Sequence, residues 1–162
     1  MHPETPNHAT QVAAWWEPKA AHLSAPQSVT LFQRALDALW QRAARTLGEV
    51  TLAAIGDRVL VIASEKYPFL SSLKTGAAGV SFDAFRLSEA EAQDHRLGDG
   101  ACFVLVEFLT LIGSLTGEIM TPALHAELSR VVIDEPTHPS KRTKRGPRVG
   151  RSRDSRAQGA NS

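Results

Sequence analysis

The chain has 162 residues, with 18 lysines and arginines against 17 aspartates and glutamates, and 43% of its residues are hydrophobic. This length fits one domain with disordered ends, and the composition is ordinary for a soluble protein. The single cysteine excludes an intramolecular disulfide and a cysteine-based zinc site.

Charge is distributed unevenly along the chain. Residues 136–162 contain eight basic residues and one acid, which gives a net charge of +7. The preceding 135 residues contain ten basic and sixteen acidic residues, which gives −6. An acidic body joined to a cationic tail points to a polyanionic or acidic partner.

The first 27 residues predict an irregular N-terminal arm. They include Pro3, Pro6, Pro18 and Pro26, and prolines interrupt regular structure because they lack a backbone donor. The tryptophan pair at 15–16 is expected to dock on the body, since two indoles left in water are unfavourable. No basic stretch followed by an apolar one marks a secretory signal, so a cytoplasmic location without membrane contact is expected.

A helix is predicted from Ser28 to Leu47. Ser28 suits the N-cap, and Gly48 suits the residue that ends the helix. Apolar residues recur at steps of three and four, as one face of an amphipathic helix requires. They are Val29, Phe32, Leu36, Leu39, Trp40, Ala43 and Leu47.

Residues 50–66 allow two interpretations. A β-hairpin could turn at Gly56–Asp57, but the second half does not alternate between apolar and polar residues as a half-buried strand should. The helical interpretation is favoured, because it aligns five apolar residues on one stripe. They are Leu52, Ile55, Val59, Ile62 and Ala63.

The rest of the body predicts a connector and three further helices. Residues 67–85 form the connector, with a packed turn at Pro68. Ser88 and Glu91 have the spacing of a capping box, which indicates a short exposed helix. A central apolar helix opens at Asp99 or Gly100 and runs to about Gly117.

The last helix is predicted to begin with Thr121 as N-cap and Pro122 as first helical residue. The expected fold is therefore mostly α, a compact bundle of four or five helices in a single domain over residues 28–134. An irregular arm, 1–27, precedes this domain, and a disordered basic tail, 135–162, follows it.

A polar stripe follows the central helix if the helical path continues through Thr121 and Pro122. Its simplest meaning is a narrow solvent-facing seam; the alternatives are a ligand groove or a seam that fixes register against a second copy. Glu107 and Glu118 would lie roughly 16 Å apart along a helix, too far to share a metal ion. The stripe comprises Glu107, Thr110, Ser114, Glu118, Thr121 and His125.

Gly113 and Gly117 form a small-xxx-small pair that lets another helix approach closely. Packing within the chain is the simpler interpretation, and a homodimer contact is the alternative.

No catalytic, metal-binding or cofactor-binding motif is recognisable. The sequence contains no Gly-x-Ser-x-Gly elbow, no phosphate-binding Gly-x-x-x-x-Gly-Lys loop and no Gly-x-Gly-x-x-Gly turn. We therefore expect no cofactor and no metal, and a non-enzymatic helical interaction or regulatory module that binds a protein partner. The alternatives are a nucleic-acid-associated protein and, third, a small-molecule-binding protein or enzyme that uses the polar stripe.

The tail supplies electrostatic affinity in either of the first two cases. It contains no aromatic side chain, so binding to single strands would not involve stacking. The candidate polyanion-binding residues are Lys141, Arg142, Lys144, Arg145, Arg148, Arg151 and Arg153.

Overall fold

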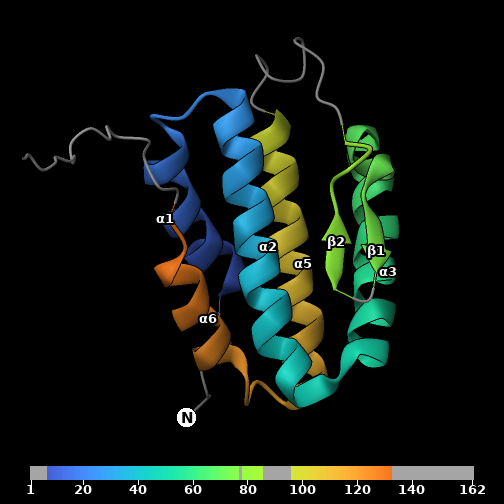
Figure 1. Ribbon diagram of the computed structural model, residues 1–162. Helices are drawn as coiled ribbons and strands as arrows, with labels where there is room; N and C mark the ends of the chain where they lie inside the picture. Colours follow the sequence, from blue (N-terminus) through green and yellow to red (C-terminus); the bar gives the residue numbers. More distant parts are fainter. Residues whose placement is uncertain (1–6, 77, 86–95, 133–162) are drawn as a thin grey trace, which may run out of the picture.

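The computed structural model describes residues 7–76, 78–85 and 96–132. Within them lie five α-helices, a 3-10 helix and a two-stranded antiparallel hairpin, which confirms the mostly α prediction (Figure 1). The elements are α1 (His8–Ala20), α2 (Ala25–Leu47), α3 (Glu49–Lys66), η1 (Pro68–Ser72), β1 (Lys74–Gly76), β2 (Gly79–Ser81), α5 (Arg96–Thr116) and α6 (Thr121–Arg130).

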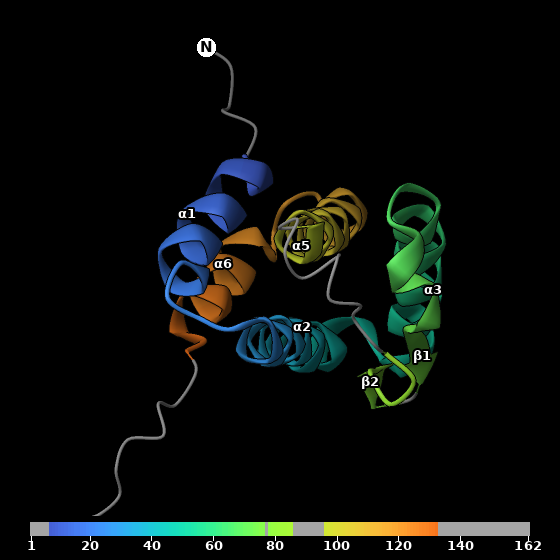
Figure 2. The same cartoon turned by 90° about the horizontal axis from the view of Figure 1, so that it is seen from above.

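Helix α5 is the centre of the bundle, as its apolar sequence predicts. It contacts α1, α2, α3 and α6. Figure 2 shows α2 and α5 between two flanks, with α1 and α6 on one side and α3 with the hairpin on the other. Trp40 of α2 stacks on Phe108 of α5, with ring centroids 5.9 Å apart, so the two central helices share one aromatic contact.

Among the described residues, α5 is the one helix whose length and apolar composition would allow it to cross a membrane. Half of its most apolar stretch is buried inside this fold. The same composition is typical of a core helix.

The prediction of an irregular N-terminal arm is wrong for residues 8–20, which form α1. The Asn7 side chain caps this helix by accepting a hydrogen bond from the backbone N–H of Thr10. Pro18 lies in the last turn, where it removes one backbone hydrogen bond, the one to the carbonyl of Ala14, and the helix ends two residues later. The tryptophan pair docks on the body as predicted, because Trp15 and Trp16 are each 5% exposed and belong to the common core.

Helix α2 begins three residues earlier than predicted. Its N-cap is Ser24, which forms a capping box with Gln27: each side chain accepts a hydrogen bond from the other residue's backbone N–H. Pro26 stands in the first turn, where its missing N–H is harmless. Ser28 is consequently a buried helical residue rather than the cap. The prediction that Gly48 ends the helix is confirmed by its φ of +85°.

Residues 50–66 are helical, so the hairpin alternative is wrong. Gly56 does not form a turn; it lets α3 approach α2, because a Cβ at this position would lie 2.9 Å from Cζ3 of Trp40. The hairpin lies instead at residues 74–81, with Thr75 paired with Val80. The predicted turn at Pro68 is confirmed as η1, which buries Leu70. The short helix predicted at Ser88 lies outside the described residues.

The chain reverses direction between α5 and α6. Gly117 and Glu118 both have positive φ, +61° and +64°, and the backbone N–H of Glu118 donates to the carbonyl of Gly113 at 2.7 Å. This hydrogen bond and a left-handed glycine define a Schellman ending. Thr121 is the first residue of α6 and Met120 its cap, one position earlier than predicted.

Candidate functional site

The predicted polar stripe is divided between two parts of the fold. Glu107, Thr110 and Ser114 remain on α5. Glu118 lies in the turn and His125 lies on α6, because the left-handed residues after Thr116 end the helical path. The stripe is therefore not one continuous surface.

The structure brings Glu118 and His125 together through a residue that the sequence analysis did not single out. His8 of α1 is 7% exposed, and its Nδ1 lies 3.0 Å from Nε2 of His125. Its Nε2 lies 3.6 Å from Oε1 of Glu118. Thr121 donates a hydrogen bond from its hydroxyl to the same carboxylate oxygen. His8, Glu118, Thr121 and His125 form what we call the polar network.

The geometry of the polar network assigns its protons. When Nε2 of His8 carries the hydrogen that faces Glu118, the neutral ring accepts at Nδ1 from the Nε2–H of His125. Burial, and then the proximity of His8, lower the pKa of His125, while the charge of Glu118 opposes them. The lowered pKa suits His125 to the neutral state near pH 7.

The polar network fits a structural clamp better than a reactive centre. The two nitrogens of His8 face different partners, so the network does not aim three ligands at one point. Among the described residues, no group of three histidine, cysteine or acidic side chains could hold a metal ion. The network joins α1 to the α5–α6 turn and to α6.

Gly113 and Gly117 do not form one face of a helix. Gly117 lies beyond the end of α5, in the left-handed turn. A Cβ on Gly113 would lie 2.5 Å from Oε1 of Glu118, so the Glu118 side chain already occupies the space that a partner helix would need. The close packing at Gly113 is within the chain.

Three large apolar side chains are exposed near one end of the bundle. Val50 is 86% exposed in the first turn of α3, and Leu115 and Ile119 are 61% and 82% exposed on either side of the α5–α6 turn. Figure 1 shows the α2–α3 corner and the α5–α6 turn at the same lower end of the molecule. We call these three residues the apolar end.

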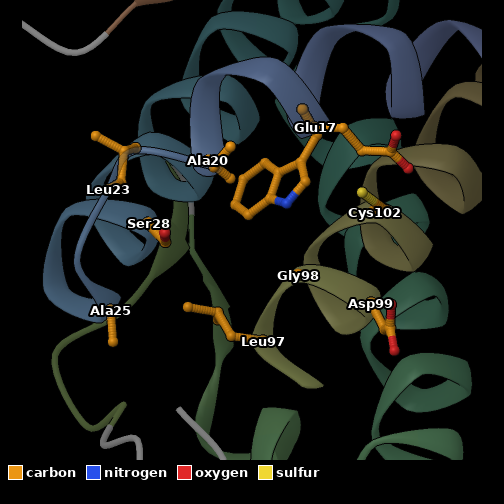
Figure 3. Close-up of a pocket in the computed structure, with 11 residues that line it drawn as sticks. Glu17, Ala20, Leu23, Ala25, Ser28, Leu97, Gly98, Asp99 and Cys102 are labelled. Atoms are coloured by element: carbon orange, nitrogen blue, oxygen red, sulfur yellow. The ribbon is translucent and has the colours of Figure 1, made fainter. Parts of the chain in front are cut away.

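A pocket of about 400 Å³ lies where the α1–α2 connection meets the first turns of α5 (Figure 3). Cys102 is one of the residues that line it. Burial, followed by the charges of Asp99 and Glu17, raises the pKa of this thiol to about 12, so the thiol is protonated near neutral pH. The lining residues are Trp16, Glu17, Ala20, Ala21, Leu23, Ala25, Ser28, Leu97, Gly98, Asp99 and Cys102.

The candidate residues of the tail, Lys141 to Arg153, lie outside the described residues. The described part of the chain is almost neutral, with nine basic and ten acidic side chains.

The chain matches no protein-family model, no curated protein and no solved structure. The functional argument therefore depends on the geometry of this chain.

Proposed function

We propose that this chain is a non-enzymatic helical interaction module that binds another protein through the apolar end. The observation that carries the proposal is the exposure of Leu115 and Ile119 on either side of one turn. Exposed apolar side chains that gather on a surface are typical of docking sites. The basic tail adds electrostatic affinity, so the partner has acidic residues beside an apolar surface.

A second copy of the chain fits this description less well. The face with Gly113, for which a homodimer contact was the alternative interpretation of the sequence, is filled by Glu118. We therefore propose a different protein as the partner.

The state of the reactive side chains supports a function without catalysis. The Cys102 thiol is protonated at neutral pH. His8 and His125 bond to each other, and the Glu118 carboxylate accepts from Thr121. These contacts favour a role in holding the fold, and the proposal includes no cofactor and no metal. With its single cysteine, the chain is also suited to a reducing compartment, and we propose the cytoplasm.

The test compares the apolar end with a matched exposed position. Full-length wild type, the double variant Leu115→Ser/Ile119→Ser and the control Val61→Ser would be used as bait under identical conditions. Val61 is 58% exposed on α3 and lies outside the apolar end. A partner retained by wild type and by Val61→Ser but lost with the double variant supports the proposal.

Two results would contradict this assignment. If the double variant retains the same partner, the apolar end is not the contact surface. If wild type forms a dimer in sedimentation experiments and the double variant is a monomer, the apolar end binds a second copy instead.

The charge of the tail favours a second candidate, a nucleic-acid-associated protein. Eight basic residues against one acid in residues 136–162 would give non-specific affinity for phosphates. If five cations contact duplex phosphates, log affinity falls with log salt at a slope of about −4.5. A full-length variant with glutamine at the seven candidate tail positions should lose this binding. Failure of wild type to bind DNA or RNA at low salt rejects the candidate.

A further inference from the structure

Two side chains that are otherwise buried present a polar group to the pocket beside α5. Trp16 is 5% exposed and Ser28 is 8% exposed, and both line the pocket. Within the part of the chain that the structure describes, neither the indole N–H of Trp16 nor the hydroxyl of Ser28 has a hydrogen-bond partner. Neither atom belongs to the fully buried polar atoms that lack a partner, so both open onto the pocket, where water or a polar group of a ligand can bond to them.

The shape of the pocket supports this interpretation. Its volume, about 400 Å³, lies in the range of small-molecule sites. Gly98 brings the backbone of α5 against the indole, because a Cβ there would lie 3.1 Å from Nε1 of Trp16. Leu23 and Leu97 add apolar wall, so a ligand needs an apolar stem as well as polar groups.

The charged side chains of the pocket are both acidic. Glu17 and Asp99 are exposed carboxylates, and Figure 3 shows them on the same side of the pocket as Cys102. The charges of both carboxylates act at the Cys102 thiol, which indicates a negative potential inside the pocket. The first turn of α5 contributes the positive end of a helix dipole, and Asp99 within that turn offsets it.

The cations near these elements are engaged away from the pocket. Nζ of Lys19 lies 5.6 Å from the centroid of the Trp15 ring, and Arg96 is an exposed residue whose charge acts at Tyr67. Neither residue lines the pocket. The acidic groups of the pocket are therefore not neutralised by a lining lysine or arginine within the described residues.

We propose that this pocket binds the side chain of an arginine or lysine residue within a peptide segment. The cationic group lies between Glu17 and Asp99, and the aliphatic stem packs on Trp16 and Leu97. A peptide carbonyl accepts from the indole N–H, and the Ser28 hydroxyl accepts from an N–H of the ligand. A cation beside the indole face is further stabilised by the ring.

The basic tail of the same chain can supply this chemistry, and so can a partner protein. The indole N–H of Trp15, on α1, donates to the carbonyl of Val131 at 3.2 Å. The last described residues therefore lie beside α1, the helix that also carries Glu17. Eight residues lie between Val132 and Lys141, and the nine steps from one Cα to the next span about 30 Å when extended. The pocket is independent of the apolar end, so either proposal can fail without the other.

The test uses the full-length chain labelled with ¹⁵N, in which the three tryptophan indole N–H groups give separate NMR signals. The probe is acetyl-arginine methylamide, and the control ligand is acetyl-citrulline methylamide, which has nearly the same shape without the charge. We expect the arginine probe to shift the Trp16 indole signal with saturation and to leave the Trp40 signal in place. Trp16→Phe assigns the signal.

Charge-neutral variants then test the two carboxylates. Glu17→Gln/Asp99→Asn should weaken binding of the arginine probe at least tenfold, whereas Glu49→Gln, an exposed carboxylate at the opposite end, should leave it unchanged. The proposal is overturned if the shift does not saturate, if the citrulline ligand binds equally well, or if the double variant binds as tightly as wild type.

A second arm identifies the source of the cation. Full-length protein with glutamine at Lys141, Arg142, Lys144 and Arg145 is compared with wild type without any probe. A changed Trp16 signal together with tighter binding of the arginine probe shows that the tail occupies the pocket. An unchanged signal with unchanged probe affinity assigns the pocket to a segment of another protein.

Discussion

At the residue scale, Gly113 leaves room for the side chain of Glu118 and not for a second helix. The sequence presents it as half of a small-xxx-small pair, yet the space above its Cα is filled by the carboxylate of Glu118. That carboxylate also accepts from Thr121 and lies beside His8. Gly113 is therefore required for the position of the polar network.

This arrangement predicts that the effect of Gly113→Ala changes sign with the residue at position 118. In wild type, the new methyl group displaces the Glu118 carboxylate from its hydrogen bond with Thr121, and loss of a hydrogen bond to a charged group costs about 1.5–3 kcal/mol. In the Glu118→Ala background the obstruction is absent, and alanine should stabilise α5 by up to about 1 kcal/mol, because it is the better helix former. Urea unfolding of the four proteins measures both effects.

Gly117→Ala is the matched control for this cycle. A Cβ there meets no atom within 4 Å, but φ is +61°. The substitution should cost about 1–2 kcal/mol in both backgrounds, since the left-handed conformation alone sets the cost. Equal effects of Gly113→Ala in both backgrounds would show that Glu118 does not occupy the space above Gly113.

His125 makes stability depend on pH in a predictable direction. Burial and the neighbouring His8 lower its pKa in the folded state, below the unfolded value of about 6.5. The unfolded chain then binds more protons between these two pKa values. The contribution of His125 to stability is thus fully present above the unfolded pKa and is lost as pH falls through it towards the folded pKa.

The variant His125→Gln should weaken this pH dependence. Glutamine retains an N–H that can donate towards His8 but does not titrate. Between pH 7.5 and 5.5, urea midpoints should therefore fall less for His125→Gln than for wild type. His22→Gln changes an exposed histidine and should follow the wild-type curve. Identical slopes for wild type and His125→Gln would exclude His125 as the group responsible.

At the scale of elements, periodicity predicts most of the fold correctly. Apolar steps of three and four identify α2, α3 and α5, because each helix buries one continuous face. The sequence does not lead to a prediction of α1, because the prolines of residues 1–27 argue against a helix more strongly than one short apolar pattern argues for it. His8, Val12, Trp15 and Trp16 have the same helical spacing, and Asn7 before them is a good N-cap, so the signal was present.

The contact between α3 and α2 gives a prediction at this scale. Gly56 lies in the interior of α3, where alanine would normally stabilise a helix by about 1 kcal/mol. Its Cβ would lie 2.9 Å from Trp40, and Trp40 is held by its stacking on Phe108. Gly56→Ala should therefore destabilise the protein by about 1–3 kcal/mol, measured by urea unfolding.

A second substitution tests whether Trp40 is the side chain that the new methyl group at position 56 would meet. Gly56→Ala should be tolerated better in a Trp40→Phe background, because the smaller ring leaves room for the methyl group. An increase in stability on Gly56→Ala in the otherwise native chain would mean that the two helices are not in close contact at this point.

At the scale of the whole molecule, the sites depend on contacts that periodicity does not contain. The polar network joins His8 to His125, which are 117 positions apart. The pocket combines the α1–α2 connection with the start of α5. The sequence could suggest Glu118 and His125 as polar residues on an apolar helix, but only the reversal at Gly117 and the docking of α1 bring His8 to them.

The distribution of charge is also clearer in the folded molecule. Six of the acids before the tail lie outside the described residues, so the described fold is almost neutral while the first 135 residues carry −6. These acids are Glu4, Glu89, Glu91, Asp94, Asp134 and Glu135. The proposed role of the tail is contact with an acidic surface of a partner.

This role predicts that stability and binding respond differently when the tail is neutralised. Replacing the seven candidate cations with glutamine lowers the formal charge of the chain from +1 to −6. The free energy of unfolding should change by no more than about 0.5 kcal/mol, the range typical of substitutions between polar surface residues. Binding to a partner through the apolar end should weaken at low salt and lose its salt dependence, since screening acts on the charges that were removed. Thermal unfolding and titrations at two salt concentrations measure the two responses.

A large loss of stability would instead assign the tail to the fold, because its cations would then be stabilising the body itself.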